Sequence, residues 1–451
     1  MSGLTSQQRK LVYLAGILLL LIPIIYFGLP SAGSGAQVRS GGALAQLRQK
    51  YDLGEVDLGA VDPSSVTMNL VLLGLRGVAV NQLWIQMDMA KNEKDWSRMK
   101  SITESIVRLQ PHYERVWDFN GWNLAWNTSA EWDAVPDRYY WVKEGGKFLI
   151  RGVKRNEKST DLRFRVATLY QKKIGIADES SYFRRYFLSD PDVEQFQGGP
   201  DPGFNPNGLD NYQVAGDWYQ KAVDNEVTWN VPQHVVDRPI FHSMPARCLF
   251  DYAQGLQKDG KFGEITRVAW ADALDSWVNR FGNEEFVAEF GGKPVRFKLE
   301  ATNEDLASLG GSVEMIPLVR QAVDSYQKMV NYRYWRTRGQ SEAETETADA
   351  HRNLFEAGEY FKKQDLQEAL PLLEKTLAQF EHVLNRFPTL QDSDEMIEEC
   401  LLAIKMWSDI YRLQGDSLPQ DFPLKQIWQQ HQWRMPTVEK EFRRRFLTTA
   451  N

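Results

Sequence analysis

The chain has 451 residues, 43% of them hydrophobic, which is enough for two or three domains with buried cores. Its formal net charge is -7 at pH 7, so the chain lacks the excess of basic residues that would favour nucleic acid as a partner. The two cysteines, Cys248 and Cys400, lie far apart, and a core of this size does not depend on a disulfide, although an export compartment would permit one bridge.

The first predicted element is an uninterrupted apolar run from Leu11 to Leu29, directly after Arg9 and Lys10. A helix of about 20 apolar residues spans a hydrocarbon core about 30 Å thick. Cations precede the run and no charge follows it before Arg39, so the positive-inside rule places the N-terminus in the cytoplasm. We therefore predict a single-pass protein of the inner (cytoplasmic) membrane, in contact with the bilayer through residues 11–29, with an extracytoplasmic body.

The main alternative is a cleaved secretory signal, because Ser34, Gly35 and Ala36 form a plausible small-residue site. A signal core usually spans about 7–15 residues, less than this run, which favours the anchor. A buried helix of a cytoplasmic protein rarely stays apolar on every face for this length. A second apolar stretch, residues 68–87, has Arg76 near its centre at an insertion cost of about 2.5–3.5 kcal/mol, so we predict a mostly buried helix of the body.

Changes in composition and the positions of Gly- and Pro-rich stretches divide the chain into five parts. We predict a cytoplasmic tip and transmembrane anchor at 1–30, a stalk rich in Gly, Ser and Asp at 31–65, an N-terminal helical-repeat region at 66–195, an irregular middle region with loops, helices and a hairpin at 196–310, and a C-terminal helical-repeat region at 311–451.

Apolar residues recur at helical spacing through most of the body, and short stretches of helix-breaking residues separate these segments. Since short connections imply antiparallel neighbours, the body is predicted to be a stack of helical hairpins. The predicted helices are 67–90, 95–109, 113–127, 136–155, 160–174, 211–227, 246–258, 262–281, 313–336, 342–363, 365–386, 392–414 and 437–446.

Two stretches are rich in proline and are predicted to be irregular. Residues 196–208 hold four glycines and three prolines and form a loop, and residues 228–245 hold three prolines. Within the second, the segment 237–247 either supports neighbouring helices or touches a partner, and we favour support. Residues 286–301 alternate apolar and charged side chains around Gly291 and Gly292, which predicts a β-hairpin. The fold class is therefore mainly α: one N-terminal transmembrane helix, then stacked helical hairpins, with a small β-hairpin near 286–301.

Towards the C-terminus, small and apolar residues recur at the spacing of a known repeat, at Leu354, Ala357, Gly358, Phe361, Ala369, Leu373 and Pro388. The pattern resembles the tetratricopeptide repeat, in which small residues let two helices approach and a proline closes the unit. Residues 76–111 and 139–170 are similar to degenerate versions of it. The whole chain looks like bacterial membrane-anchored proteins with divergent repeats of this kind, and the resemblance implies partner binding on a concave helical surface.

Motifs that carry chemistry are missing from the sequence. The six histidines include no HExxH and no pair spaced to share one metal on a helix. Gly145-Gly146-Lys147 is followed by Phe148, unlike a phosphate loop, and Ser243 has no flanking glycines, unlike a nucleophile elbow. We predict no cofactor, no metal and no enzymatic activity; an enzyme assembled from distant residues stays an alternative.

Aromatic side chains are the strongest compositional signal, with 15 Trp in the chain. Five of them either pack between helices, which we favour, or line a sugar-binding groove. They are Trp117, Trp122, Trp126, Trp132 and Trp141.

Seven polar or aromatic residues are the candidates for partner binding. Three asparagines among them share one helical face at spacings of three and four, as on the inner helices of repeat proteins, although hydrogen bonding to neighbouring helices explains them equally well. The candidates are Arg76, Trp84, Asn120, Asn123, Asn127, Arg163 and Arg165.

The leading functional hypothesis is a membrane-tethered extracytoplasmic scaffold that binds a protein or peptide partner on its helical surface. The alternative is a glycan-binding or glycan-modifying component of the cell envelope that uses the tryptophan cluster. A third hypothesis is a structural envelope protein without a discrete ligand.

Overall fold

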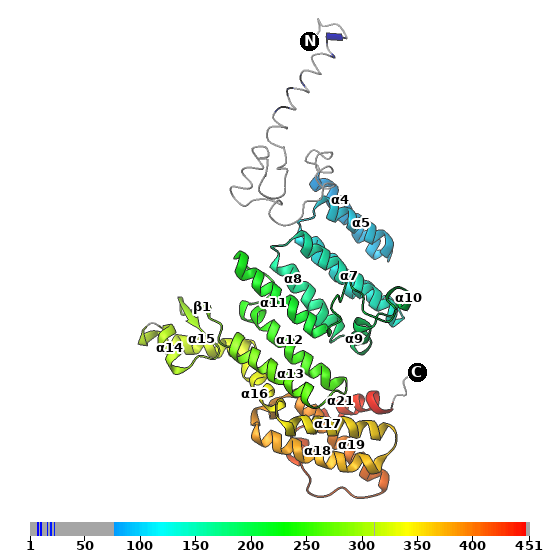
Figure 1. Ribbon diagram of the computed structural model, residues 1–451, viewed down its shortest axis with the longest axis vertical. Coiled ribbons are helices and arrows are strands. Elements are labelled where there is room, and N and C mark those ends of the chain that lie inside the picture. The colour runs from blue at the N-terminus through cyan, green and yellow to red at the C-terminus, as the bar shows by residue number, and fades with distance from the viewer. Residues whose placement is uncertain are drawn as a thin grey trace. The chain divides into compact units, whose positions relative to one another are not determined.

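The computed structural model describes residues 76–310 and 312–447, together with residues 7, 8, 10, 16, 19 and 22 (Figure 1). Over these residues the chain is mainly α-helical with a two-stranded antiparallel hairpin, which confirms the fold class at this level. Two compact units are present. The first comprises the described residues up to Val166 together with Asn225–Val231, and the second comprises Ala167–Asp224 and the described residues from Pro232 on.

The predicted stalk at 31–65 and nearly all of the predicted anchor at 1–30 lie outside the described residues. Among the helices that are described, none is both long enough and apolar enough to cross a bilayer. The second apolar stretch is described only from α4 (Arg76–Asn92) on. This helix buries Val80 and Met87 but exposes Val78 and Ile85, so the predicted mostly buried helix is buried on one face only.

The first unit continues with α5 (Trp96–Leu109), α6 (Glu114–Trp122), its π-helical extension η2 (Asn123–Thr128), α7 (Val135–Arg155) and most of α8 (Thr160–Thr168). These bounds confirm the four helices predicted between residues 95 and 174, since α8 extends into η3 (Leu169–Ile174). The α5 N-terminus is capped by Asp95, whose carboxylate accepts a 3.0 Å hydrogen bond from the Arg98 amide. Along α5, Met99, Ile102 and Ile106 recur at helical spacing and are buried.

Glycines set how closely α6, η2 and α7 approach one another. A Cβ added at Gly145 would lie 2.7 Å from the Gly121 carbonyl oxygen and 2.8 Å from the Ala125 amide nitrogen. A Cβ at Gly152 would lie 2.8 Å from the Cβ of Trp117. Gly145 and Gly152 therefore leave room for the neighbouring backbone and the indole.

The second unit begins with η3, followed by α9 (Ser180–Leu188), α10 (Val193–Phe196) and α11 (Asn211–Trp229), whose last residues belong to the first unit. The predicted loop at 196–208 is confirmed, whereas α9 and α10 were not predicted. The loop contributes Phe204 to the core, where its ring lies 4.9 Å from that of Tyr170 and 5.5 Å from that of Phe187. The Tyr170 hydroxyl donates to the Phe204 carbonyl at 2.7 Å.

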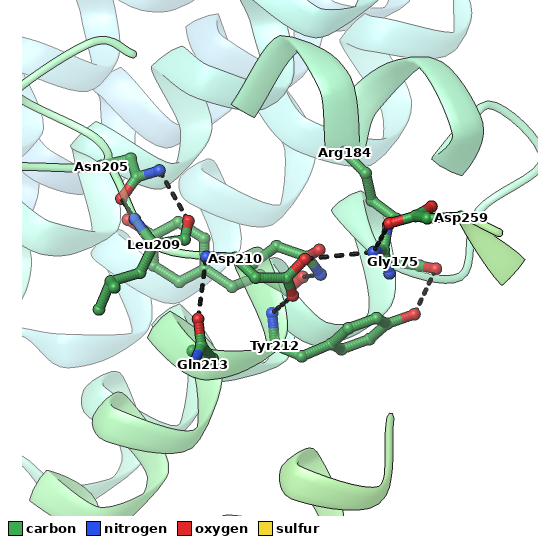
Figure 2. A network of polar contacts seen from close by, with 10 residues as sticks. Gly175, Arg184, Asn205, Leu209, Asp210, Tyr212, Gln213 and Asp259 are labelled. Atoms are coloured by element: carbon green, nitrogen blue, oxygen red, sulfur yellow. Dashed lines mark hydrogen bonds and ion pairs between the residues drawn. The ribbon is translucent and has the colours of Figure 1, made fainter. Parts of the chain in front are cut away.

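Asn205 fixes the end of this loop (Figure 2). Its buried amide donates to the carbonyls of Phe187 and Leu209, both at 3.0 Å, and its side-chain oxygen accepts from the Leu209 amide at 3.2 Å. One side chain thus replaces the regular backbone pairing that a loop with three prolines cannot make.

Arg184 on α9 joins the same loop to the end of α12 (Figure 2). Its guanidinium lies 3.1 Å from the Asp210 carboxylate and 2.7 Å from that of Asp259, and it covers the Tyr212 ring. Tyr212 in turn donates its hydroxyl to the Gly175 carbonyl at 2.6 Å. Burial raises the pKa of Asp210 from its ordinary value, against the opposing charge of Arg184.

The helix α12 (Arg238–Lys258) corrects the prediction of an irregular stretch up to residue 245. Pro239 occupies the first turn, where a missing amide proton costs no hydrogen bond. Pro245 lies inside the helix, and burial of Phe241 and Phe250 on either side of it stabilises the turn that its ring weakens. Burial of Phe241 and His242 also favours structural support as the role of segment 237–247.

After α13 (Glu264–Asp275) and its π-helical extension η4 (Ser276–Phe281) comes the predicted hairpin, formed by β1 (Phe286–Phe290) and β2 (Lys293–Phe297). The register pairs Phe286 with Phe297 and Phe290 with Lys293. The two turn residues, Gly291 and Gly292, have φ of 57° and 74°, values that favour glycine in a two-residue hairpin turn. The hairpin is thus confirmed.

The predicted helix 313–336 is wrong as a single element. The chain forms α14 (Asn303–Gly310), the short η5 (Val313–Met315), α15 (Ile316–Met329) and then α16 (Tyr332–Glu342). The break occurs at Asn331, whose left-handed φ of 54° ends one helix and starts the next. The new direction brings the Tyr332 ring to 5.3 Å from that of Trp277 in a stacked pair.

The C-terminal part is α17 (Thr345–Lys362), α18 (Leu366–Arg386), η6 (Pro388–Asp392), α19 (Asp394–Gln414), α20 (Lys425–Gln430), η7 (Gln432–Arg434), α21 (Met435–Phe442) and η8 (Arg443–Leu447). Figure 1 shows α17, α18 and α19 packed side by side. Their shared core contains Ala357, Phe361, Ala369 and Leu373. Cys400 on α19 and Cys248 on α12 are both buried and free.

Candidate functional site

A groove of about 440 Å³ opens on the first unit, between the C-terminal halves of α5 and α7 and the start of α6. α5 and α7 both end beside it, so the side chains of their last turns meet around one space. Its lining residues are Glu104, Val107, Arg108, Pro111, Trp117, Arg151, Lys154 and Arg155.

The apolar part of the groove is rigidly held. Val107 and Trp117 are 5% and 4% exposed, so each shows only an edge to the groove. The Trp117 indole donates to the Pro111 carbonyl at 2.7 Å, and the buried Asn156 amide donates to the same carbonyl at 3.1 Å. Two donors on one carbonyl fix the turn between α5 and α6, and the ring has no room to move because the Gly152 backbone lies against it.

The charged part of the groove is strongly cationic, with four cations against one carboxylate. Arg151 is held in place: its guanidinium lies 2.5 Å from the Glu104 carboxylate and 5.2 Å from the centre of the Phe148 ring. Arg108 and Lys154 are exposed, and neither makes a hydrogen bond or ion pair with any residue of the described chain. Their positions in the last turns of α5 and α7 suit the helix dipoles but supply no counter-ion.

The three predicted asparagines lie together on α6 and η2, but largely inside the unit. Asn120 and Asn123 are each 1% exposed, and their amides donate to the carbonyls one turn earlier, of Val116 at 2.8 Å and Phe119 at 2.9 Å. Asn127 is half-buried and donates to the Asn123 side chain at 2.7 Å. These hydrogen bonds favour the structural interpretation for Asn120 and Asn123.

Trp84 is half-buried on α4, with its ring 5.5 Å from that of Phe119. Arg76 is the first residue of α4, and its side chain lies outside what the structure describes. Trp84 does not line the groove.

The two predicted arginines of α8 are half-buried and partnered. Arg163 donates to the Ser159 carbonyl at 2.8 Å, and burial lowers its pKa from the ordinary value. Arg165 pairs with Asp118 at 3.2 Å. The structure therefore does not gather the six candidates whose side chains it describes into one cavity, and none of these six lines the groove.

The tryptophan cluster forms two pairs rather than one platform. The rings of Trp122 and Trp126 stack with centroids 6.2 Å apart and an interplanar angle of 13°. Trp132 and Trp141 stack at 6.2 Å and 30°. One side chain of each pair is exposed: Trp122 by 46% of its area and Trp132 by 38%. The fifth tryptophan of the cluster, Trp117, is buried.

Sequence reasoning missed the groove because its cations belong to two helices, with Arg108 more than 40 positions before Arg151, Lys154 and Arg155. The signal that was available is the pair of basic helix ends, Arg108 in the predicted helix 95–109 and Lys154 with Arg155 in the predicted helix 136–155. Over the described residues, no group of three or more His, Cys, Asp or Glu side chains is arranged to hold a metal ion.

Neither a family model, nor a curated protein, nor a solved structure matches this chain. The argument for function therefore depends on the groove and on the helical architecture around it.

Proposed function

We propose that this protein is a membrane-tethered scaffold that binds a protein or peptide partner outside the cytoplasm through the surface of its stacked helices. The observation that carries the proposal is the groove between α5, α6 and α7, where rigid apolar residues lie beside two cations, Arg108 and Lys154, that have no counter-ion in the described chain. Such a surface suits recognition of another chain, because apolar area supplies affinity and fixed charge supplies specificity.

The tether and the compartment rest on the apolar run at residues 11–29 and the preceding Arg9 and Lys10. Under this proposal the N-terminus stays in the cytoplasm and both units lie on the other side of the inner membrane.

The tetratricopeptide-like interpretation is supported by the C-terminal helix pair. Ala357 and Ala369 are fully buried in the core that α17 and α18 share, so small residues occupy two of the positions at which that repeat brings its two helices together. Gly358 instead leaves room for η8, because a Cβ added there would lie 2.9 Å from the Phe446 ring. We propose that the chain is a divergent member of this architectural class.

The proposal is tested with the full-length chain in cells. A photoreactive amino acid at position 108 should cross-link a partner, whereas the same group at the exposed Lys375 of α18 should not. Protease added to spheroplasts should degrade the body. Protection of the body until the cells are lysed, or identical cross-links from both positions, would overturn the proposal.

The second candidate, a glycan-binding or glycan-modifying envelope component, is favoured by one observation: Trp122 is 46% exposed and backed by the parallel Trp126 ring, a geometry on which a sugar stacks. Only two rings of the cluster, Trp122 and Trp132, are exposed, which makes this the weaker candidate. Sedimentation with purified cell-wall glycan, compared between the native chain and Trp122→Ala, tests it; equal sedimentation of both would exclude the platform.

A further inference from the structure

The groove on the first unit brings together features that define its ligand more narrowly than a generic partner surface. We infer that it binds an acidic peptide segment, in which carboxylates pair with Arg108 and Lys154 and a neighbouring apolar side chain rests against Trp117. This inference rests on the proposed scaffold function and names the chemistry of its partner.

Charge is the first argument. Arg108 and Lys154 lie on the same groove, and Glu104, the one carboxylate among its described lining residues, is already engaged by Arg151. Arg108 and Lys154 therefore repel one another across a space of about 440 Å³ with no anion of the described chain paired to either. An incoming carboxylate removes that repulsion and forms charge-assisted hydrogen bonds.

The arrangement of the cations is the second argument. Arg151 is fixed by Glu104 and by the Phe148 ring, so the groove keeps one preoriented guanidinium at its wall. Arg108 and Lys154 are exposed and free to turn towards a ligand. Planar guanidinium groups match carboxylates in a two-point geometry, which favours Asp and Glu side chains or a chain terminus.

The size and the apolar part of the groove are the third argument. A space of about 440 Å³ admits a few side chains of an extended segment and excludes a folded domain. Val107, Pro111 and Trp117 add apolar edges to the groove, which a bare anion would leave without a contact. Nucleic acid needs cations along a longer track than the four that line this groove. An acidic peptide with interspersed apolar residues uses both parts of the site.

The direct test uses a dye-labelled peptide with four repeats of Asp-Leu-Glu and the full-length chain in detergent, measured by fluorescence anisotropy. The peptide should bind, and the double variant Arg108→Glu with Lys154→Glu should weaken binding at least about tenfold, because two attractive contacts become repulsive. Binding should also weaken as salt is raised. The isosteric peptide with Asn-Leu-Gln repeats should bind at least about tenfold more weakly.

The matched control is Lys363→Glu with Lys375→Glu, which makes the same change in net charge at two exposed lysines of the second unit. It should bind the acidic peptide as the native chain does. Thermal melting followed by circular dichroism must show that both double variants fold; if the first does not, the single variant Lys154→Gln takes its place.

Three outcomes would overturn the inference: equal binding by the groove variant and the native chain, equal binding of the neutral peptide, or displacement of the peptide by millimolar glycerol phosphate, which would make the groove a phosphate site. Loss of peptide binding leaves the scaffold proposal standing if the cross-link from position 108 persists. Peptide binding without any partner cross-link in cells would instead count against the scaffold.

Discussion

The imidazole of His351 on α17 lies with its Nε2 atom 2.9 Å from the Glu342 carboxylate at the end of α16, and both side chains are almost completely buried. The same carboxylate lies 2.7 Å from the Arg338 guanidinium, and the other imidazole nitrogen, Nδ1, lies 2.9 Å from the Glu399 carboxylate on α19. Three helices of the second unit are therefore joined by one ionic network. Removing one of its charged groups would leave its partner buried without a compensating charge.

The pH dependence of stability follows from this network. Burial alone would lower the pKa of His351, but the carboxylates of Glu342 and Glu399 outweigh it and raise that pKa to about 10. Burial alone would raise the pKa of Glu342, but Arg338 and His351 outweigh it and lower that pKa to about 2.

The contribution of His351 to folding stability is therefore complete below pH 6.5, the pKa of a histidine in the unfolded chain, and is lost as pH rises towards about 10. The contribution of Glu342 to folding stability is complete above pH 4.5, the pKa of a glutamate in the unfolded chain, and is lost as pH falls towards about 2. Urea unfolding should give its highest midpoint between these limits, near pH 4.5–6.5 for this network. A midpoint that rises steadily from pH 6.5 to pH 9 would contradict the assignment.

Removing one member of the network should be costly. Glu342→Gln leaves Arg338 buried without its carboxylate and leaves His351 with Glu399 as its one remaining carboxylate, and the expected loss is about 3–5 kcal/mol of unfolding free energy. The matched control is Glu346→Gln, which removes the partner of His382, a pair at 2.7 Å whose imidazole is 62% exposed. Its loss should be at most about 1 kcal/mol in the same urea titration.

The approach of α6 to α7 predicts a second sensitive position. Gly152→Ala should destabilise the first unit by about 1–3 kcal/mol, because the new methyl group would meet the Trp117 side chain at 2.8 Å. Gly77→Ala on α4 is the control: no atom of the described residues lies within 4 Å of its added Cβ, so the better helix propensity of alanine should stabilise by up to about 1 kcal/mol. Equal thermal shifts in both variants would show that the contact does not matter.

The loop before α11 predicts a local effect. Asn205→Ala leaves the carbonyls of Phe187 and Leu209 and the Leu209 amide without their buried partner, at a cost of about 2–4 kcal/mol. Limited proteolysis should then cut within residues 196–210 well before the native chain is cut. Asn207→Ala, at an exposed position of the same loop, should leave the cleavage pattern unchanged.

The elements that could be predicted are those whose signal is local. The helices α5 and α7 follow from apolar side chains at helical spacing, and the hairpin follows from alternation around Gly291 and Gly292. The prediction failed where packing overrode a local signal. Pro245 marked an irregular segment, yet burial on both sides keeps α12 helical through it. Asn331 gave no sign of the left-handed turn that separates α15 from α16.

The candidate site divides in the same way. The sequence predicted three asparagines on one helical face, and α6 with η2 places them there: Asn120, Asn123 and Asn127. Helical spacing alone does not tell whether such a face points to solvent or to the core. Two of the three, Asn120 and Asn123, are buried. The basic helix ends at Arg108 and Lys154 were visible in the sequence, but a cation at the end of a helix is common and does not by itself indicate a site.

The sequence by itself determined the helical composition, the hairpin and the positions of the charges along each helix, since these depend on neighbours within a few residues. Only the tertiary structure decided which helix ends meet. The distance between Arg108 and Lys154 depends on how α5, α6 and α7 pack, and that packing depends on where glycines such as Gly145 and Gly152 let one backbone approach another.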